Sequence, residues 1–169
     1  MKATRVTRVV LVAVLLGCGD RVPTGVTPRA SGFEQPSLLA YAGLVRCTPL
    51  APDSATQTIG PLGGVIRVGP HRLSIPAGAL DVPVVITAVA PADTLNRIQL
   101  EPQGLTFHQP ASLALSYANC SGLASLLPKR IAYTSHDLVI LAVLPSVDDI
   151  VTQTVTGRLE HFSDYAIAW

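Results

Sequence analysis

Charged residues are scarce in this 169-residue sequence, and no basic cluster is present. Only 14% of the residues are Asp, Glu, Lys or Arg, and they form no run of one sign. Proteins that bind nucleic acid through its phosphates concentrate Lys and Arg on one face. The composition therefore excludes electrostatic steering of a polyanion, and we expect no nucleic-acid partner.

Aromatic residues are also few, at 5% of the chain. A carbohydrate- or peptide-binding β-sandwich would display a row of exposed aromatic side chains. The few aromatic residues of this chain give that function little support. No glycine-rich loop leads from a strand into a helix, so no phosphate-binding loop is predicted. No cysteine has His or Asp at ligand spacing, so we expect no metal and no cofactor.

The remaining polar residues favour ordinary structural positions. His71, His108 and His136 are scattered beside turns or strand ends, and we expect them to be surface or hydrogen-bonded histidines. The triplet 135–137 (SHD) is predicted to be a turn, because adjacent residues on a strand point to opposite faces and cannot relay a proton. Asp148 and Asp149 are predicted to be solvated loop residues between two strands.

No apolar run is long enough to span a membrane. Three basic residues precede an apolar run over residues 9–16. A spanning helix needs roughly 20 apolar residues, so this run has the length of a signal-peptide core. Residues 1–17 are therefore predicted to be a secretory signal peptide, and we expect export from the cytoplasm.

The block 15–18 (LLGC) resembles the bacterial lipobox, in which the cysteine receives a diacylglycerol and becomes the mature N-terminus. The resemblance implies lipidation at Cys18 and attachment to the inner or outer membrane. Two or three acyl chains on one residue hold a protein durably at a membrane. The alternative is an ordinary signal peptide with an incidental cysteine.

The mature chain is expected to begin with a tether. Residues 18–37 are rich in Pro, Gly, Ser and Thr and have no apolar period, which predicts a flexible linker behind the anchor. The stretch 38–45 is apolar enough to be a first strand or a piece packed on the domain. Cys47 and Cys120 form an even pair in an exported chain, which predicts a disulfide, with two buried free thiols as the alternative.

From about Thr56 the sequence consists of short β-branched runs separated by Pro and Gly. This pattern predicts a single all-β domain over residues 38–169, an antiparallel β-sandwich. The runs lie at 63–68, 71–76, 82–91, 97–102, 105–110, 112–118, 130–135, 138–145, 152–161 and 164–169.

Several of these elements together resemble the ZU-five domain, the β-sandwich shared by zonula occludens proteins, netrin receptors of the uncoordinated-five type and ankyrins. The resemblance covers residues from about 57 to 169. It rests on the stretches 59–64 (IGPLGG), 69–73, 75–80 (IPAGAL), 100–107 (LEPQGLTF) and 113–117, with Pro110.

In some members of that family, His-Phe-Ser on a late strand is a self-cleavage site, and His161, Phe162 and Ser163 stand in the matching place. The resemblance implies attack of Ser163 Oγ on the Phe162 carbonyl, with His161 as base. On a regular strand His161 and Ser163 share one face and Phe162 points to the other. A packing motif without catalysis is the alternative, and we expect it to apply.

The sequence thus predicts an exported, membrane-anchored lipoprotein at the bacterial cell envelope. Its β-sandwich is expected to be a non-enzymatic structural or protein-interaction module with an unidentified protein partner. Self-cleavage between Phe162 and Ser163 is the alternative function.

Overall fold

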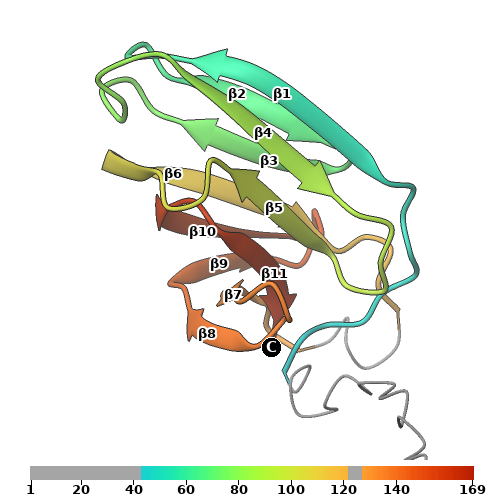
Figure 1. The fold of residues 1–169 in the computed structure, drawn as a ribbon. Coiled ribbons are helices and arrows are strands. Elements are labelled where there is room, and N and C mark those ends of the chain that lie inside the picture. The colour runs from blue at the N-terminus through green and yellow to red at the C-terminus, as the bar shows by residue number, and fades with distance from the viewer. Residues whose placement is uncertain (1–42, 122–126) are drawn as a thin grey trace, which may run out of the picture. The chain divides into compact units, whose positions relative to one another are not determined.

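The computed structural model describes residues 43–121 and 127–169. Within these ranges the chain forms eleven β-strands and no helix, and the strands make two antiparallel sheets packed face to face (Figure 1). The all-β sandwich predicted from the sequence is confirmed. The predicted signal peptide (1–17), Cys18 and the predicted tether (18–37) lie outside the described residues. None of the described residues forms a helix of the length and hydrophobicity that a membrane span requires.

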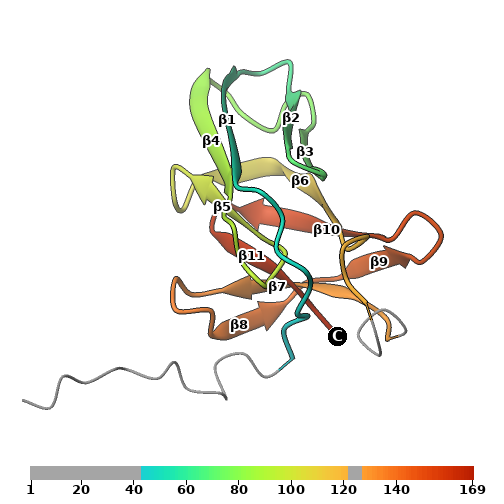
Figure 2. The same cartoon turned by 90° about the vertical axis from the view of Figure 1, so that its right-hand side faces the viewer.

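The first sheet has six strands in the order β1-β4-β5-β11-β7-β8. They are β1 (Asp53–Ile59), β4 (Val84–Ala90), β5 (Arg97–Glu101), β7 (Arg130–Thr134), β8 (Ile140–Val143) and β11 (Asp164–Ala168). The second sheet has five strands in the order β2-β3-β6-β10-β9. They are β2 (Gly64–Val68), β3 (His71–Ile75), β6 (Thr106–Ser116), β9 (Ser146–Asp149) and β10 (Thr154–His161). Figure 2 shows β1 and β4 facing β2 and β3 across the sandwich.

Period-two alternation fills the space between the sheets. Along β4, Ile86, Ala88 and Ala90 are buried while the residues between them are partly exposed, as expected for a strand with one face on a core. Both sheets contribute side chains to this core, which includes Ile59, Ile66, Leu73, Leu100, Leu113, Leu115, Ile131, Val155, Leu159 and Tyr165.

A smaller apolar cluster forms on the opposite face of the six-stranded sheet. Ala132, Ala166 and Ala168 alternate with core residues along β7 and β11, and Leu44, Leu95 and Leu138 pack over them. Leu44 forms a β-bridge with Ala168. The prediction that the apolar stretch 38–45 packs on the domain is therefore confirmed for Leu44 and Val45, and residues 38–42 lie outside the described part.

Three strand predictions need correction. β1 is absent from the predicted runs because its residues are mostly polar and exposed. The predicted runs 105–110 and 112–118 form one strand, β6, which continues through Pro110. Residues 146–149 form β9 and pair with β10, so the prediction of a loop at Asp148 and Asp149 was wrong.

Candidate functional site

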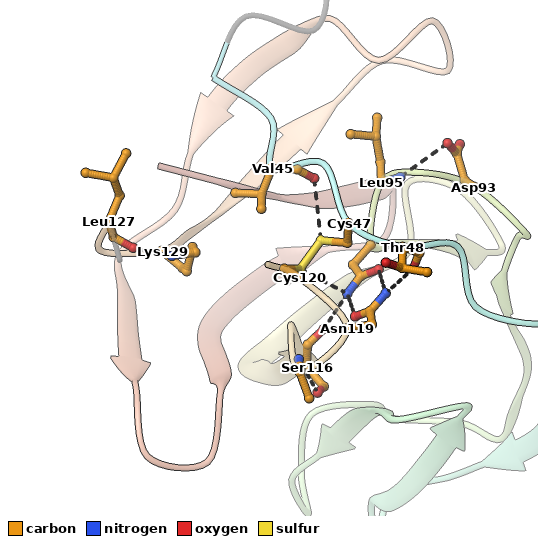
Figure 3. Close-up of a disulfide and its surroundings, with 12 residues drawn as sticks. Val45, Cys47, Thr48, Asp93, Leu95, Ser116, Asn119, Cys120, Leu127 and Lys129 are labelled. Atoms are coloured by element: carbon orange, nitrogen blue, oxygen red, sulfur yellow. Dashed lines mark hydrogen bonds between the residues drawn. A yellow bond between two sulfur atoms is a disulfide. The ribbon is translucent and has the colours of Figure 1, made fainter. Parts of the chain in front are cut away.

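A disulfide fastens the first described residues to the sandwich. Cys47 lies in the leading segment (residues 43–50), and Cys120 follows β6; the bond between them links positions 73 residues apart (Figure 3). The leading segment also hydrogen-bonds to the sandwich backbone on both sides of Cys47, from Val45 N–H to the Ile167 carbonyl at 2.9 Å and from Thr48 N–H to the Asn119 carbonyl at 3.1 Å. The predicted disulfide is therefore present.

Two asparagines brace this junction. The Asn96 amide donates to Asn119 Oδ1 at 2.6 Å, and the Asn119 amide donates back to Asn96 Oδ1 at 3.0 Å. The Asn96 amide also donates to the Ser116 carbonyl at 2.8 Å. The Asn119 amide also donates to the Thr48 carbonyl at 2.6 Å. Buried amides need such partners, so the network fixes the leading segment against the end of β6 (Figure 3).

The triplet His161, Phe162 and Ser163 lies where the chain crosses from one sheet to the other. β10 ends at His161 and β11 begins at Asp164, and the pairing of β10 with β6 shifts register after Leu159. Phe162 and Ser163 are consecutive and both buried. The prediction of a regular strand with alternating faces was therefore wrong here, because the sheet crossing interrupts the alternation.

The Phe162 peptide groups are held by the turn between β5 and β6. Gly104 N–H donates to the Phe162 carbonyl at 3.0 Å, and Phe162 N–H donates to the Leu105 carbonyl at 2.8 Å. The Phe162 ring packs edge-on against Phe107 with 5.1 Å between centroids. The carbonyl that a nucleophile at Ser163 would attack thus carries one backbone donor, a group that stabilises negative charge on the oxygen.

His161 packs among tyrosines. Its ring meets Tyr133 edge to face, with 5.1 Å between centroids, and its carbonyl accepts a 2.6 Å hydrogen bond from the Tyr165 hydroxyl. Burial raises the pKa of the Tyr165 phenol, with a smaller contribution from Tyr133, so this hydroxyl remains a donor at neutral pH.

Ser163 opens into a hollow of about 420 Å³ that His161 does not line. The hollow contains Asp164, and Glu101, Gln103, His136 and Leu141 also line it. We call it the Asp164 hollow. The structure therefore brings Ser163 to the same depression as His136 and Asp164, an arrangement that the sequence analysis missed because His136 lies in a distant hairpin turn.

The Asp164 carboxylate is buried and surrounded by donors. The amides of Gln99 and Gln103 donate to it at 3.4 and 3.3 Å, respectively, and the exposed His136 Nδ1 lies 3.6 Å from Oδ2. Asp164 follows the predicted triplet directly, but its partners lie on β5, on the β5–β6 turn and in the β7–β8 turn. Only the fold assembles this cluster.

A second polar cluster joins β6, β7 and β9. The Tyr117 hydroxyl donates to Asp148 Oδ1, and Lys129 N–H donates to Asp148 Oδ2 at 2.8 Å. The buried Lys129 ammonium donates to the Leu127 carbonyl and lies 4.9 Å from the Tyr117 ring centroid. Burial lowers the pKa of this ammonium, and the negative charge of Asp148 opposes that shift. Asp148 is thus a structural acceptor.

The other histidines have the roles predicted for them. His71 is buried, and its Nδ1 accepts a 3.2 Å hydrogen bond from Ser116 N–H; burial lowers its pKa to about 4. His108 is exposed and lies 2.7 Å from Asp81. The triplet 135–137 forms part of the β7–β8 turn, closed by Leu138 N–H donating to the Ser135 carbonyl at 2.9 Å, as predicted.

No protein-family model matches the chain, and a search of curated proteins finds no match. Among the residues that the structure describes, no group of three or more His, Cys, Asp or Glu side chains is placed to hold a metal ion.

Proposed function

We propose that this chain is an exported lipoprotein whose β-sandwich serves as a structural or protein-interaction module at the bacterial cell envelope. In this proposal residues 1–17 are a cleaved signal peptide, Cys18 carries the acyl anchor, and residues 18–37 are a tether. The sandwich is ZU-five-like over about residues 57–169 and performs no reaction on an external substrate.

The observation that carries the proposal is the disulfide between Cys47 and Cys120. Disulfides persist in oxidising compartments and are rare in reducing ones, so the bond favours a chain that has left the cytoplasm. Its position also suits a tethered domain, because it holds the segment that follows the predicted tether onto the sandwich.

The test is the intact mass of the full chain purified from a bacterial membrane fraction, compared with Cys18→Ser. We expect the wild type to lack residues 1–17 and to carry two or three acyl chains. Cys18→Ser should lose the acyl mass and leave the membrane fraction, while Cys47→Ser should keep both. A wild-type chain without acyl mass would contradict the anchor.

Self-cleavage is the second candidate function, and the hydrogen bond from Gly104 N–H to the Phe162 carbonyl favours it. In the proposed step Ser163 Oγ attacks the Phe162 carbonyl carbon, and His161 accepts the hydroxyl proton. The C–N bond then breaks, the released amine of Ser163 takes a proton, and water hydrolyses the resulting ester. The fragment 163–169 would stay paired in the sheet until the protein is denatured.

Mass spectrometry under denaturing conditions separates the two functions. Self-cleavage predicts loss of the peptide 163–169 from the wild type and an intact Ser163→Ala chain. If both chains are intact, the triplet is a packing motif and the sandwich is a module without this chemistry. His136→Ala serves as the matched control, since it removes the imidazole of the Asp164 hollow and keeps His161.

A further inference from the structure

β8 is an edge strand that presents apolar side chains to solvent. It is the last strand of the six-stranded sheet, and its residues Leu141 and Val143 are 53% and 46% exposed. The other sheet edges carry exposed charge, with Asp53 in β1, Arg67 in β2 and Asp149 in β9. Charged residues on an edge discourage pairing with another chain. Of the four edges in the described ranges, only β8 has no charged residue, and its one irregularity is a register shift at Leu141 in the pairing with β7.

The backbone at Val143 in β8 is oriented for pairing on the outer side of the strand. Leu144 N–H donates to the Ile131 carbonyl of β7 at 2.8 Å, and Ala132 lies opposite Val143. Backbone groups point alternately to the two sides of an antiparallel strand. The N–H and C=O of Val143 therefore point away from β7, where no strand of the described part pairs with them.

The two ends of β8 have opposite charge. At one end Leu141 lines the Asp164 hollow, which also contains the carboxylates of Asp164 and Glu101. At the other end Val143 lines a second hollow of about 360 Å³, whose one charged side chain is Arg130. Arg130 has no ion-pair partner in the described ranges.

A second copy of the chain matches this charge order. When two β8 strands pair antiparallel about a two-fold axis, the Val143 end of each copy lies beside the Leu141 end of the other. The positive end thus meets the negative end twice. The outward groups of Val143 then face the partner strand near Leu141, the residue at which the pairing of β8 with β7 shifts register, and Ala142 faces its own copy at the axis.

We propose that β8 is a self-association edge, through which two copies of this chain join their six-stranded sheets into one continuous sheet. A four-residue strand and its bordering hollows offer less area than the ~800 Å² per partner of a stable interface. The contact is therefore weak in solution and strengthened when both copies are confined to one membrane. The strengthening at a membrane rests on the proposed function, because it requires the lipid anchor. The pairing of two β8 strands does not require it, and it would give the sandwich a second copy of the chain as its partner.

Cysteine cross-linking tests the pairing directly. Directly opposed residues that do not exchange hydrogen bonds have Cα atoms about 4.5 Å apart in an antiparallel pair, a distance that a disulfide spans. Oxidation of Ala142→Cys in the full chain, reconstituted in lipid vesicles, should give a dimer band on a non-reducing gel. Val147→Cys, on the exposed edge strand β9, is the matched control and should remain monomeric.

A second variant shows whether the edge itself is responsible. Leu141→Lys in the Ala142→Cys background adds a charge to β8 and should abolish the dimer band, whereas Val147→Lys in the same background should leave it. Far-ultraviolet circular dichroism and the thermal midpoint show that each variant folds. An Ala142→Cys band no stronger than that of Val147→Cys, or one that survives Leu141→Lys, overturns the proposal. A cross-linked band in which the Ala142→Cys chain is joined to a different protein also overturns the self-association proposal.

Cross-linking in solution separates this proposal from the proposed lipid anchor. The Cys18→Ser, Ala142→Cys chain in solution should still cross-link as its concentration is raised, because the edge does not depend on acylation. If the mass measurement finds no lipid on Cys18 and this chain still cross-links, the anchor fails and the edge stands. If lipid is present and no dimer forms in vesicles, the edge fails and the anchor stands.

Discussion

The hydroxyl of Tyr117 donates a 2.7 Å hydrogen bond to the carboxylate of Asp148, and this contact joins the end of β6 to β9. The second oxygen of the same carboxylate accepts from Lys129 N–H at the start of β7. One half-buried aspartate thus connects both sheets.

Removing this hydroxyl should destabilise the sandwich. In Tyr117→Phe the Asp148 oxygen loses its donor, and we expect a loss of about 1.5–3 kcal/mol in the free energy of unfolding, since hydrogen bonds to charged groups contribute on this scale. Urea unfolding measures it. Tyr133→Phe is the control, because no described residue hydrogen-bonds to the Tyr133 hydroxyl, and an equal loss there would contradict the assignment.

His71 should make stability depend on pH. Burial lowers its pKa to about 4 in the folded chain, whereas an unfolded histidine titrates near 6.5. The unfolded state therefore binds more protons between these values, and stability is full above pH 6.5 and falls as the pH drops toward 4. The loss reaches about 3 kcal/mol.

His71→Asn provides the comparison for that titration. Asn Oδ1 can accept the hydrogen bond from Ser116 N–H but does not titrate. Urea unfolding across pH 4 to 7 should give a smaller slope for His71→Asn than for the wild type. Parallel curves would show that other groups cause the pH dependence.

The disulfide should contribute strongly to stability. It closes a span of 73 residues, for which the chain-entropy model gives about 4 kcal/mol. Cys47→Ala combined with Cys120→Ala should unfold at correspondingly lower urea concentration. Reductant should shift the wild-type midpoint toward that of the double variant and leave the variant unchanged. A wild-type midpoint that ignores complete reduction would contradict this contribution.

Two glycines with similar backbone angles should respond differently to alanine. Gly63 has φ +72° and Gly104 has φ +75°, so alanine is strained at both by about 1 kcal/mol. A Cβ at Gly63 would also lie 2.3 Å from the Ile75 carbonyl oxygen, whereas nothing lies within 4 Å at Gly104. Gly63→Ala should therefore cost about 1–3 kcal/mol more. Thermal midpoints of the two variants measure the difference, and similar midpoints would contradict it.

The fold class was readable from the sequence because burial and alternation coincide in strands such as β4 and β10. The strand β1 could not be predicted in this way, because most of its residues are polar and exposed to solvent. Asp148 and Asp149 have the composition of a turn, and their place in β9 depends on Tyr117 and Lys129, which are distant in sequence. Local propensity carries no information about such partners.

The candidate site shows the same limit. His161, Phe162 and Ser163 were found as a triplet, but local pattern implied an unbroken strand. The crossing between sheets at Phe162, the Gly104 donor and the approach of His136 to Asp164 all depend on tertiary structure. Sequence therefore located the segment, and the fold decided which groups surround it.

The bond between Cys47 and Cys120 also sets the route of mechanical tension. A pull on the chain ahead of Gly43 first loads the contacts of Leu44 and Val45 and then reaches Cys47. From there it passes through the sulfur atoms to Cys120. The strands β1 to β6 lie inside this covalent loop, so their backbone cannot be pulled out end to end while the disulfide is intact. While the disulfide is intact, forced extension can therefore lengthen only the residues outside the loop. Residues 47–120, which are more than half of the sandwich, contribute nothing to the extended length.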